Sequence, residues 1–334
     1  MTSPLGVDVH AHFFPEGFIR VMEQSGASFG AGVDRSSARG PVLYVGAART
    51  PPLEAQYWDL RLRLKAMNRA GVAVQALSLT APMVYWADPG VGTRLCVAFN
   101  DAASAAHTAY PDRFVGCAAL PLQDTERALG ELERAARLPG IRGVYMGTNV
   151  AGRELSDPAL FPVFQRAAAL GLPVLLHPIT VIGAERLKPY YLSNLLGNPF
   201  DTAIAAAHLV FGGVLDRLPK LEVCLPHAGG ALPYLHGRLR HGQAVRPENK
   251  GVAKKPLSTY LRRFTYDIIS HDAGALRYLV STVGADRVAL GTDFCFDMGL
   301  ARPLATIQAR AVGLSKKDQD RVIRGTGARL LRLR

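Results

Sequence analysis

Residues 7–14 read Val-Asp-Val-His-Ala-His-Phe-Phe, an apolar run that ends in two histidines. The run begins near Leu5, and His10 and His12 stand two residues apart at its end. Side chains alternate along a strand, so both imidazoles lie on one face. Two histidines at a strand end can reach one metal ion. Near the start of a long chain, they predict a barrel whose first strand carries ligands to its mouth.

The rest of the chain alternates short apolar runs with longer amphipathic segments, which is the pattern of repeated βα units. Helical spacing is clear at Leu60, Leu64 and Met67, and Gly71 suits the position just after that helix. The length of 334 residues, 49% of them hydrophobic, fits one large domain, 1–334. The sequence therefore predicts an α/β fold, a distorted (β/α)8 TIM barrel, with strands at 5–10, 73–79, 114–119, 141–145, 173–177, 222–226, 264–268 and 288–292.

Residues 13–57 interrupt this alternation. The stretch contains Gly, Pro and Ser, shows no helical period and is long for a connection between a strand and a helix. Loops of this length inside a compact domain are usually functional or form a small subdomain. We therefore expect a small insertion after the first strand, 13–57, that lies over the mouth of the barrel.

Composition argues against several classes of protein. No apolar run approaches 18 residues and the first residues lack the features of a signal peptide, so we expect a cytoplasmic protein with no membrane partner. The formal net charge is +12, but the arginines are spread over many segments, so we expect no nucleic-acid partner. Basic residues are densest between 238 and 255, where they fit either a surface loop or an electrostatic funnel for an anionic substrate.

Metal-ligating side chains stand at the ends of four predicted strands. His10 and His12 end the first, and His177, His227 and Asp293 end the fifth, sixth and eighth. The carboxyl ends of barrel strands share one face, where the active site lies. Three or four of these side chains suit one divalent metal ion with an open position, and a remaining histidine could act as a general acid or base. Zinc is expected first, with manganese, iron or cobalt as alternatives.

Several motifs in the chain resemble those of the amidohydrolase superfamily. They are His10-x-His12 followed by Phe-Phe-Pro, His177-Pro, Pro-His227-Ala-Gly-Gly and Gly-Thr-Asp293-Phe. More narrowly, the chain is similar to the branch that contains aminocarboxymuconate semialdehyde decarboxylase and related nonoxidative decarboxylases. Further matching stretches are Arg49 with Tyr57-Trp58-Asp59, Pro121-Leu122-Gln123-Asp124, Gly237-Arg238 and the ending Asp-Arg-Val-Ala-Leu-Gly-Thr-Asp-Phe at 286–294.

The resemblance implies a role for each matching residue. His10, His12, His177 and Asp293 correspond to the metal ligands, and His227 to a general base beside the metal. Arg49 corresponds to an arginine that binds a substrate carboxylate, and Arg246 also matches a family arginine. Arg238 corresponds to an arginine that one subunit of a homodimer contributes to the active site of the other.

Two departures from relatives bear on the chemistry. The predicted fourth strand lacks the lysine that bridges two metals in binuclear relatives, which favours a mononuclear site. Cys295 stands where relatives commonly have proline, and a packed neutral thiol is its expected state.

Three functions are compatible with these features. The first is a metal-dependent nonoxidative decarboxylase, without an organic cofactor, acting on a carboxylated aromatic or an unsaturated dicarboxylic acid such as a hydroxybenzoate or a muconate semialdehyde. In that reaction His227 or Asp293 would move the proton. The second is a mononuclear metal-dependent hydrolase or hydratase acting on a lactone, amide or enol acid. The third, a binding protein that has lost catalysis, is disfavoured by the intact set of five strand-end residues.

Overall fold

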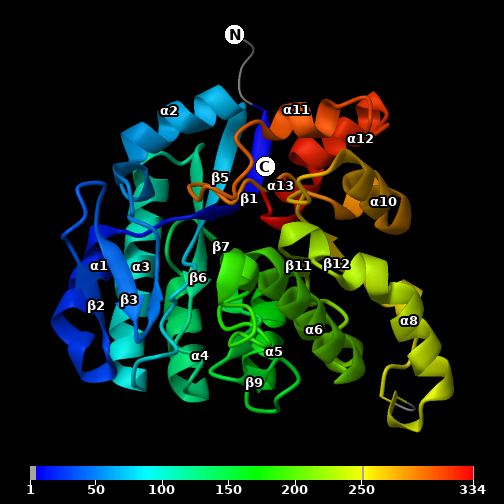
Figure 1. Ribbon diagram of the computed structural model, residues 1–334, viewed down its shortest axis with the longest axis horizontal. Coiled ribbons are helices and arrows are strands. Elements are labelled where there is room, and N and C mark those ends of the chain that lie inside the picture. Colours follow the sequence, from blue (N-terminus) through cyan, green and yellow to red (C-terminus); the bar gives the residue numbers. More distant parts are fainter. Residues whose placement is uncertain (1–4, 250–251, 334) are drawn as a thin grey trace.

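A curled, fully parallel sheet forms the centre of the protein (Figure 1). The computed structural model describes residues 5–249 and 252–333, so both ends of the predicted domain, 1–4 and 334, lie outside the described residues. Seven of the eight predicted strands are present, and the sheet runs in the order β1, β5, β6, β7, β10, β11, β12. Their bounds are β1 Gly6–His12, β5 Val72–Ser78, β6 Phe114–Ala119, β7 Ile141–Gly147, β10 Val174–His177, β11 Val223–Leu225 and β12 Phe264–Tyr266.

The predicted eighth strand, 288–292, is not a regular strand, and the prediction is wrong in this respect. The segment lies between the two edges of the sheet, because Ala289 N donates to the carbonyl of Tyr266 in β12 (2.8 Å) and Val9 N of β1 donates to the carbonyl of Leu290 (3.0 Å). Only isolated bridges form on either side. The ladder breaks because other backbone amides bond elsewhere: Leu290 N donates to the carbonyl of Val322, and Thr292 N donates to the Asp8 carboxylate.

Helices follow the strands along the chain, as the alternating pattern predicts. The predicted helix near 60–67 is α2, Leu60–Ala70, capped at its start by Asp59, whose carboxylate accepts from the amides of Arg61 and Leu62. Gly71 ends it with a left-handed φ of 73°. None of the described helices is long and apolar enough to cross a membrane. The other helices are α3 Pro89–Ala109, α4 Thr125–Ala135, α5 Phe161–Leu170, α6 Asn198–Phe211, α7 Val214–Arg217, α8 Leu232–Val245, α9 Leu257–Leu261, α10 Ala273–Val283, α11 Pro303–Gln308, α12 Lys316–Asp320 and α13 Thr326–Leu330.

The stretch 13–57 contains more regular structure than the sequence predicts. Its helix α1, Glu16–Ser25, contradicts the expectation of no helical period: Phe18, Ile19 and Met22 are buried on one face, and the pattern is too short to stand out. Three short strands form a separate antiparallel sheet at the same edge of the molecule (Figure 1). They are β2 Ala31–Asp34, β3 Val42–Val45 and β4 Ala48–Arg49.

Candidate metal centre

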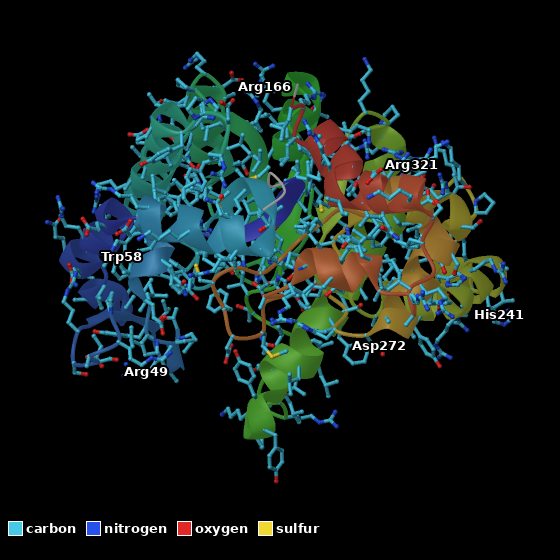
Figure 2. The ribbon with its side chains drawn as sticks, turned by 90° about the horizontal axis from the view of Figure 1, so that it is seen from above. Arg49, Trp58, Arg166, His241, Asp272 and Arg321 are labelled. Atoms are coloured by element: carbon cyan, nitrogen blue, oxygen red, sulfur yellow. The ribbon has the colours of Figure 1, made fainter. Side chains whose placement is uncertain are left out.

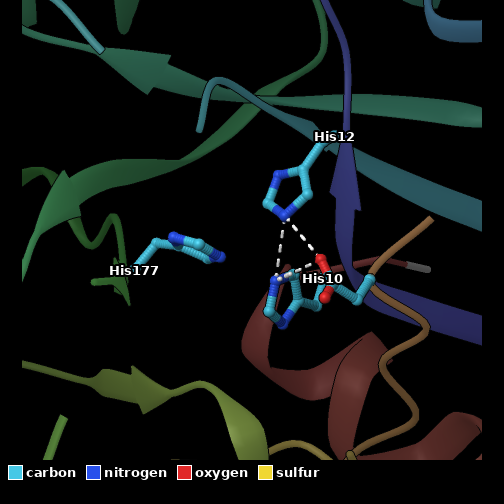
Figure 3. A group of neighbouring side chains, drawn as sticks. His10, His12 and His177 are labelled. Carbon is cyan, nitrogen blue, oxygen red and sulfur yellow. Dashed lines mark hydrogen bonds and ion pairs between the residues drawn. The ribbon is translucent and has the colours of Figure 1, made fainter. Parts of the chain in front are cut away.

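The carboxyl end of β1 places the two opening histidines side by side. His10 Nε2 and His12 Nε2 are 3.1 Å apart, and the Oδ1 atom of Asp293 lies 3.5 Å from the first and 2.9 Å from the second. His177, at the end of β10, completes a buried group whose four ligand atoms all lie within 4.8 Å of one another. Figure 3 shows the three histidine rings directed toward a common centre.

Hydrogen bonds on the outer side orient the rings of His10 and His177. Nδ1 of His10 is 2.7 Å from the Oδ2 atom of Asp267. Nδ1 of His177 donates to the carbonyl of Pro178 (2.7 Å), with the hydroxyl of Thr80 3.1 Å away. Since Nδ1 is engaged in each ring, Nε2 is the nitrogen left to face the centre, which is the usual arrangement of metal-binding histidines.

His12 is held in the same way by Ser78, the last residue of β5. The Ser78 hydroxyl donates to the carbonyl of Ala11 (3.1 Å), so its oxygen accepts from Nδ1 of His12 (3.2 Å). Burial lowers the pKa of His12 to about 4, so the ring is neutral at neutral pH. Its Nε2 lone pair therefore points toward the Asp293 carboxylate.

The Asp293 carboxylate provides the test of whether a cation fits. Burial raises its pKa, but the contact with His12 and the charges of the neighbouring histidines lower it by more, so the group is ionised. Its Oδ1 atom is buried and accepts no well-formed hydrogen bond. An anionic oxygen and an imidazole lone pair at 2.9 Å repel one another unless a cation lies between them. Three imidazoles and one carboxylate are a donor set that suits a divalent transition metal.

Asp267 organises the site, and the sequence analysis missed it. Its Oδ2 atom accepts from His10 Nδ1 and from the backbone amide of His227 (3.0 Å), while Oδ1 accepts from the amides of Ala228 (2.7 Å) and Ile269 (3.0 Å). Burial raises the pKa of Asp267, but the hydrogen bond from His10 and the positive charge of that ring lower the pKa of Asp267 by more. The sequence feature that could have identified Asp267 is its position near the end of the predicted seventh strand, 264–268.

His227 follows β11 in an unusual backbone conformation. Both His227 and Ala228 have left-handed φ values, 52° and 56°, and the two hydrogen bonds from their amides to Asp267 support this turn. The ring centroid lies 5.4 Å from those of His10 and His177. Burial lowers the pKa of His227, and its buried Nδ1 has no hydrogen-bond partner among the described residues.

A cavity of about 490 Å³ opens over this group. His177, His227 and Asp293 line it on one side, and Arg49 is the only lysine or arginine among its lining residues. Tyr85 and Trp86 form an aromatic part of its wall, together with other apolar side chains. The other apolar lining residues include Leu43, Val45, Pro82, Ile179, Val181, Phe296 and Met298.

Within this single chain, the three predicted substrate-binding arginines, Arg49, Arg238 and Arg246, lie apart from one another, and only Arg49 lines the cavity. Arg49 in β4 is half-exposed, 3.8 Å from the carboxylate of Asp34 and 5.2 Å from the Tyr44 ring centre. Arg238 is exposed on α8, and neither it nor Arg246, which pairs with Glu248, lines the cavity. Figures 1 and 2 place α8 on the side of the molecule opposite the Arg49 region.

The cysteines lie outside the metal-binding group. Cys96, Cys117 and Cys224 are buried. Burial raises the pKa of the Cys295 thiol to about 12, so it is the neutral packed thiol that the sequence analysis expected. Lys250, within the basic stretch 238–255, lies outside the described residues.

Three histidines and one aspartate are buried together at one end of a parallel sheet, beneath a mostly apolar cavity. This arrangement is typical of metal-dependent enzymes built on parallel α/β folds. The chain belongs to the amidohydrolase family, whose profile matches residues 7–333. This confirms the family that the sequence motifs predicted.

The relatives include several decarboxylases. The chain is 34% identical to 2-amino-3-carboxymuconate-6-semialdehyde decarboxylase of Dictyostelium discoideum, over 91% of this chain and 86% of that protein. It is 29% identical to gamma-resorcylate decarboxylase of Polaromonas sp. strain JS666, over 74% of this chain and 80% of that protein. The crystal structure of 5-carboxyvanillate decarboxylase from Sphingomonas paucimobilis superposes with a TM-score of 0.84 at 26% identity, covering 99% of this chain and 100% of that one.

Proposed function

We propose that this chain is a metal-dependent nonoxidative decarboxylase that acts on a carboxylated aromatic or an unsaturated dicarboxylic acid, such as a hydroxybenzoate or a muconate semialdehyde. The observation that carries the proposal is the cavity, with the buried metal-binding group on one side and Arg49 as its one basic lining residue. Its walls are otherwise mostly apolar, which suits a flat conjugated acid. The family and its decarboxylase relatives support the same reaction class.

In this proposal His10, His12, His177 and Asp293 hold one divalent ion, with zinc as the first candidate and manganese, iron or cobalt as alternatives. When bound, the ion supplies Lewis-acid polarisation and a template for the substrate. No organic cofactor is proposed.

Arg49 and the apolar walls position the substrate. The guanidinium of Arg49 is paired only loosely with Asp34, so a substrate carboxylate can displace that contact and take up two hydrogen bonds. The apolar walls, which include Trp86 and Phe296, exclude water from the conjugated system.

His227 is proposed to move the proton. Loss of CO2 leaves an electron pair on carbon, and a proton must arrive there so that a carbon–hydrogen bond replaces the carbon–carbon bond. The ring of His227 can accept a proton from solvent at Nδ1 without breaking an existing hydrogen bond, and can then deliver it to that carbon. Asp293, ionised and among the ligands, is better suited to hold charge than to donate this proton.

The proposal also includes the complete barrel, the insertion over its mouth and the homodimer. We infer that the curled sheet and the 288–294 segment form a distorted eight-stranded TIM barrel, and that 13–57 is an insertion over its mouth. We also propose a cytoplasmic homodimer in which Arg238 serves the neighbouring active site, with no nucleic-acid or membrane partner. Arg246 is proposed as a further substrate-binding arginine.

The test is an assay of CO2 release from metal-loaded protein with a panel of hydroxybenzoates and muconate semialdehydes. Turnover of at least one acid, with one CO2 released per product formed, is expected. Hydrolysis of lactones or amides, or hydration of enol acids, with no CO2 from any acid would reject the decarboxylase in favour of the hydrolase or hydratase. Mixing Arg49→Ala and Arg238→Ala proteins, each impaired at substrate concentrations below KM, tests the shared site, because mixed dimers should regain activity at those concentrations.

A further inference from the structure

Arg63 is fully buried in α2, yet no carboxylate of the described residues lies within ion-pair distance of it. Its Nε atom donates to the Oε1 atom of Gln75 (2.8 Å), and Nη1 donates to the carbonyl of Gln56 (3.3 Å). The Nη2 atom has no partner among the described residues. Burying a guanidinium costs several kcal/mol of hydration, so a buried cation with no carboxylate partner points to a role beyond stability.

Gln75 connects this cation to the strand that carries the first two ligands. While its Oε1 accepts from Arg63, its Nε2 donates to the Oδ2 atom of Asp8 (3.0 Å). Asp8 in turn accepts from the backbone amide of His10 (3.1 Å). It also accepts from the amide of Thr292 (3.0 Å) and from its hydroxyl (2.6 Å). All of these side chains are buried, so water does not compete for the hydrogen bonds.

Asp8 therefore ties together two segments that are 284 residues apart in the sequence. One segment ends in His10 and the other leads into Asp293, whose own amide donates to the carbonyl of His10 (2.8 Å). The spacing of these segments sets the distance between an imidazole and a carboxylate of the metal-binding group.

The same guanidinium also contacts the residues that follow the ligands. Its carbon lies 4.8 Å from the ring centre of Phe294, directly after Asp293, and 6.0 Å from that of Phe13, directly after His12. A buried cation over aromatic faces is attracted by them. Arg63 thus contacts both ligand-bearing segments directly as well as through Gln75.

We propose that Arg63 is a positioning residue of the metal centre, which acts through Gln75 and Asp8 to hold His10 and Asp293 at the spacing that one ion requires. The inference rests on the proposed function, because it takes the four ligands to bind a metal ion. It adds a role for a residue that lies outside both the ligand group and the cavity lining.

The experiment measures Co(II) binding to the full-length Arg63→Met protein. Affinity is determined by competition with a chelator, and the visible absorption of bound Co(II) reports the ligand geometry. We expect affinity to fall about 10–100-fold, the usual effect of removing an outer partner of metal ligands, and the absorption bands to shift. The matched control is Arg113→Met. Arg113 donates to the carbonyl of Ala73 (2.7 Å) near the amino end of β5, away from the ligands, and its loss should change affinity less than twofold.

Two further variants test the path through Asp8. If Arg63 acts through this carboxylate, the double variant Arg63→Met, Asp8→Asn should bind Co(II) no more weakly than the weaker of the two single variants. Losses that multiply would overturn the path. Gln75→Met keeps both charges and the side-chain length, so it gives the same test if Arg63→Met does not fold, and it should weaken binding in the same range.

The outcomes separate the two proposals. Failure of the unaltered protein to bind one equivalent of Co(II) would reject the proposed metal site, and the role of Arg63 with it. Tight binding by the unaltered protein, with the same affinity and absorption spectrum in Arg63→Met and Gln75→Met, would reject the role of Arg63 alone.

Discussion

Replacing Asp267 by asparagine should weaken metal binding while leaving the fold intact. The carboxylate accepts four hydrogen bonds, two at each oxygen: three from backbone amides, which can only donate, and one from Nδ1 of His10, which must carry the proton when Nε2 is left free for a metal ion. An asparagine offers one accepting oxygen, so in either orientation its NH2 group faces two donors. Two hydrogen bonds to a charged acceptor are lost, each contributing about 1.5–3 kcal/mol. With the amide oxygen toward Ala228 and Ile269, the bond from His10 is lost and its ring is free to turn.

The expected effect on the metal is about 10–100-fold in dissociation constant, since partners of ligating histidines contribute this much. Chelator competition measures the affinity, and chemical denaturation of metal-free protein measures the stability, which should fall by about 3 kcal/mol or more. Asp216→Asn is the matched control, because that carboxylate also accepts from a backbone amide, of Lys254 (3.0 Å), and from Tyr260, but lies away from the site. An Asp267→Asn protein that binds metal as tightly as the control would refute the reasoning.

Three further outcomes follow from the site. His227→Asn should lower kcat by about 10²–10⁴-fold with unchanged metal content, and a near-normal kcat would exclude it from proton transfer. Arg49→Met should raise KM about tenfold with little change in kcat, whereas Arg35→Met, which removes a surface arginine paired with Glu23, should do neither. Metal-free protein should become more stable as pH rises from about 4 to 6.5. In that window burial keeps His12 and His177 neutral in the folded state while they are protonated in the unfolded state, so stability is lost as pH falls. Asp8, whose pKa burial raises to about 6, opposes them between 3.8 and 6, but one carboxyl group does not offset two imidazoles. Denaturation midpoints should therefore rise with pH across this range, and midpoints that fall would contradict the prediction.

The strand-end residues could be predicted from the sequence because each follows its own apolar run. His10, His12, His177 and Asp293 needed only the rule that parallel strands end on one face, and the structure brings all four within ligand distance. Asp267 obeys the same rule but stands in a stretch with no other chemical signal.

Other features depend on contacts that no local pattern contains. The segment 288–292 has the composition of a strand, but the Asp8 carboxylate and the carbonyl of Val322 take its amides out of the ladder. Arg63 occupies a helical position where exposure is the usual outcome, and only the assembled structure shows it buried against Gln75. Parts of the cavity wall, such as Trp86, Ile179 and Phe296, likewise come from loops whose conformations the sequence does not specify.

The charges at the centre explain why metal affinity and pH are linked here. Asp267 and Asp293 are both ionised beside His10. Burial lowers the pKa of His10, but the hydrogen bond to Asp267 and the charge of Asp293 raise it by more, which favours the protonated ring. A metal ion that binds Nε2 of His10, 3.1 Å from Nε2 of His12, must displace the proton of that nitrogen. The ion therefore replaces one positive charge with two, and the second balances the Asp293 oxygen, which accepts no well-formed hydrogen bond.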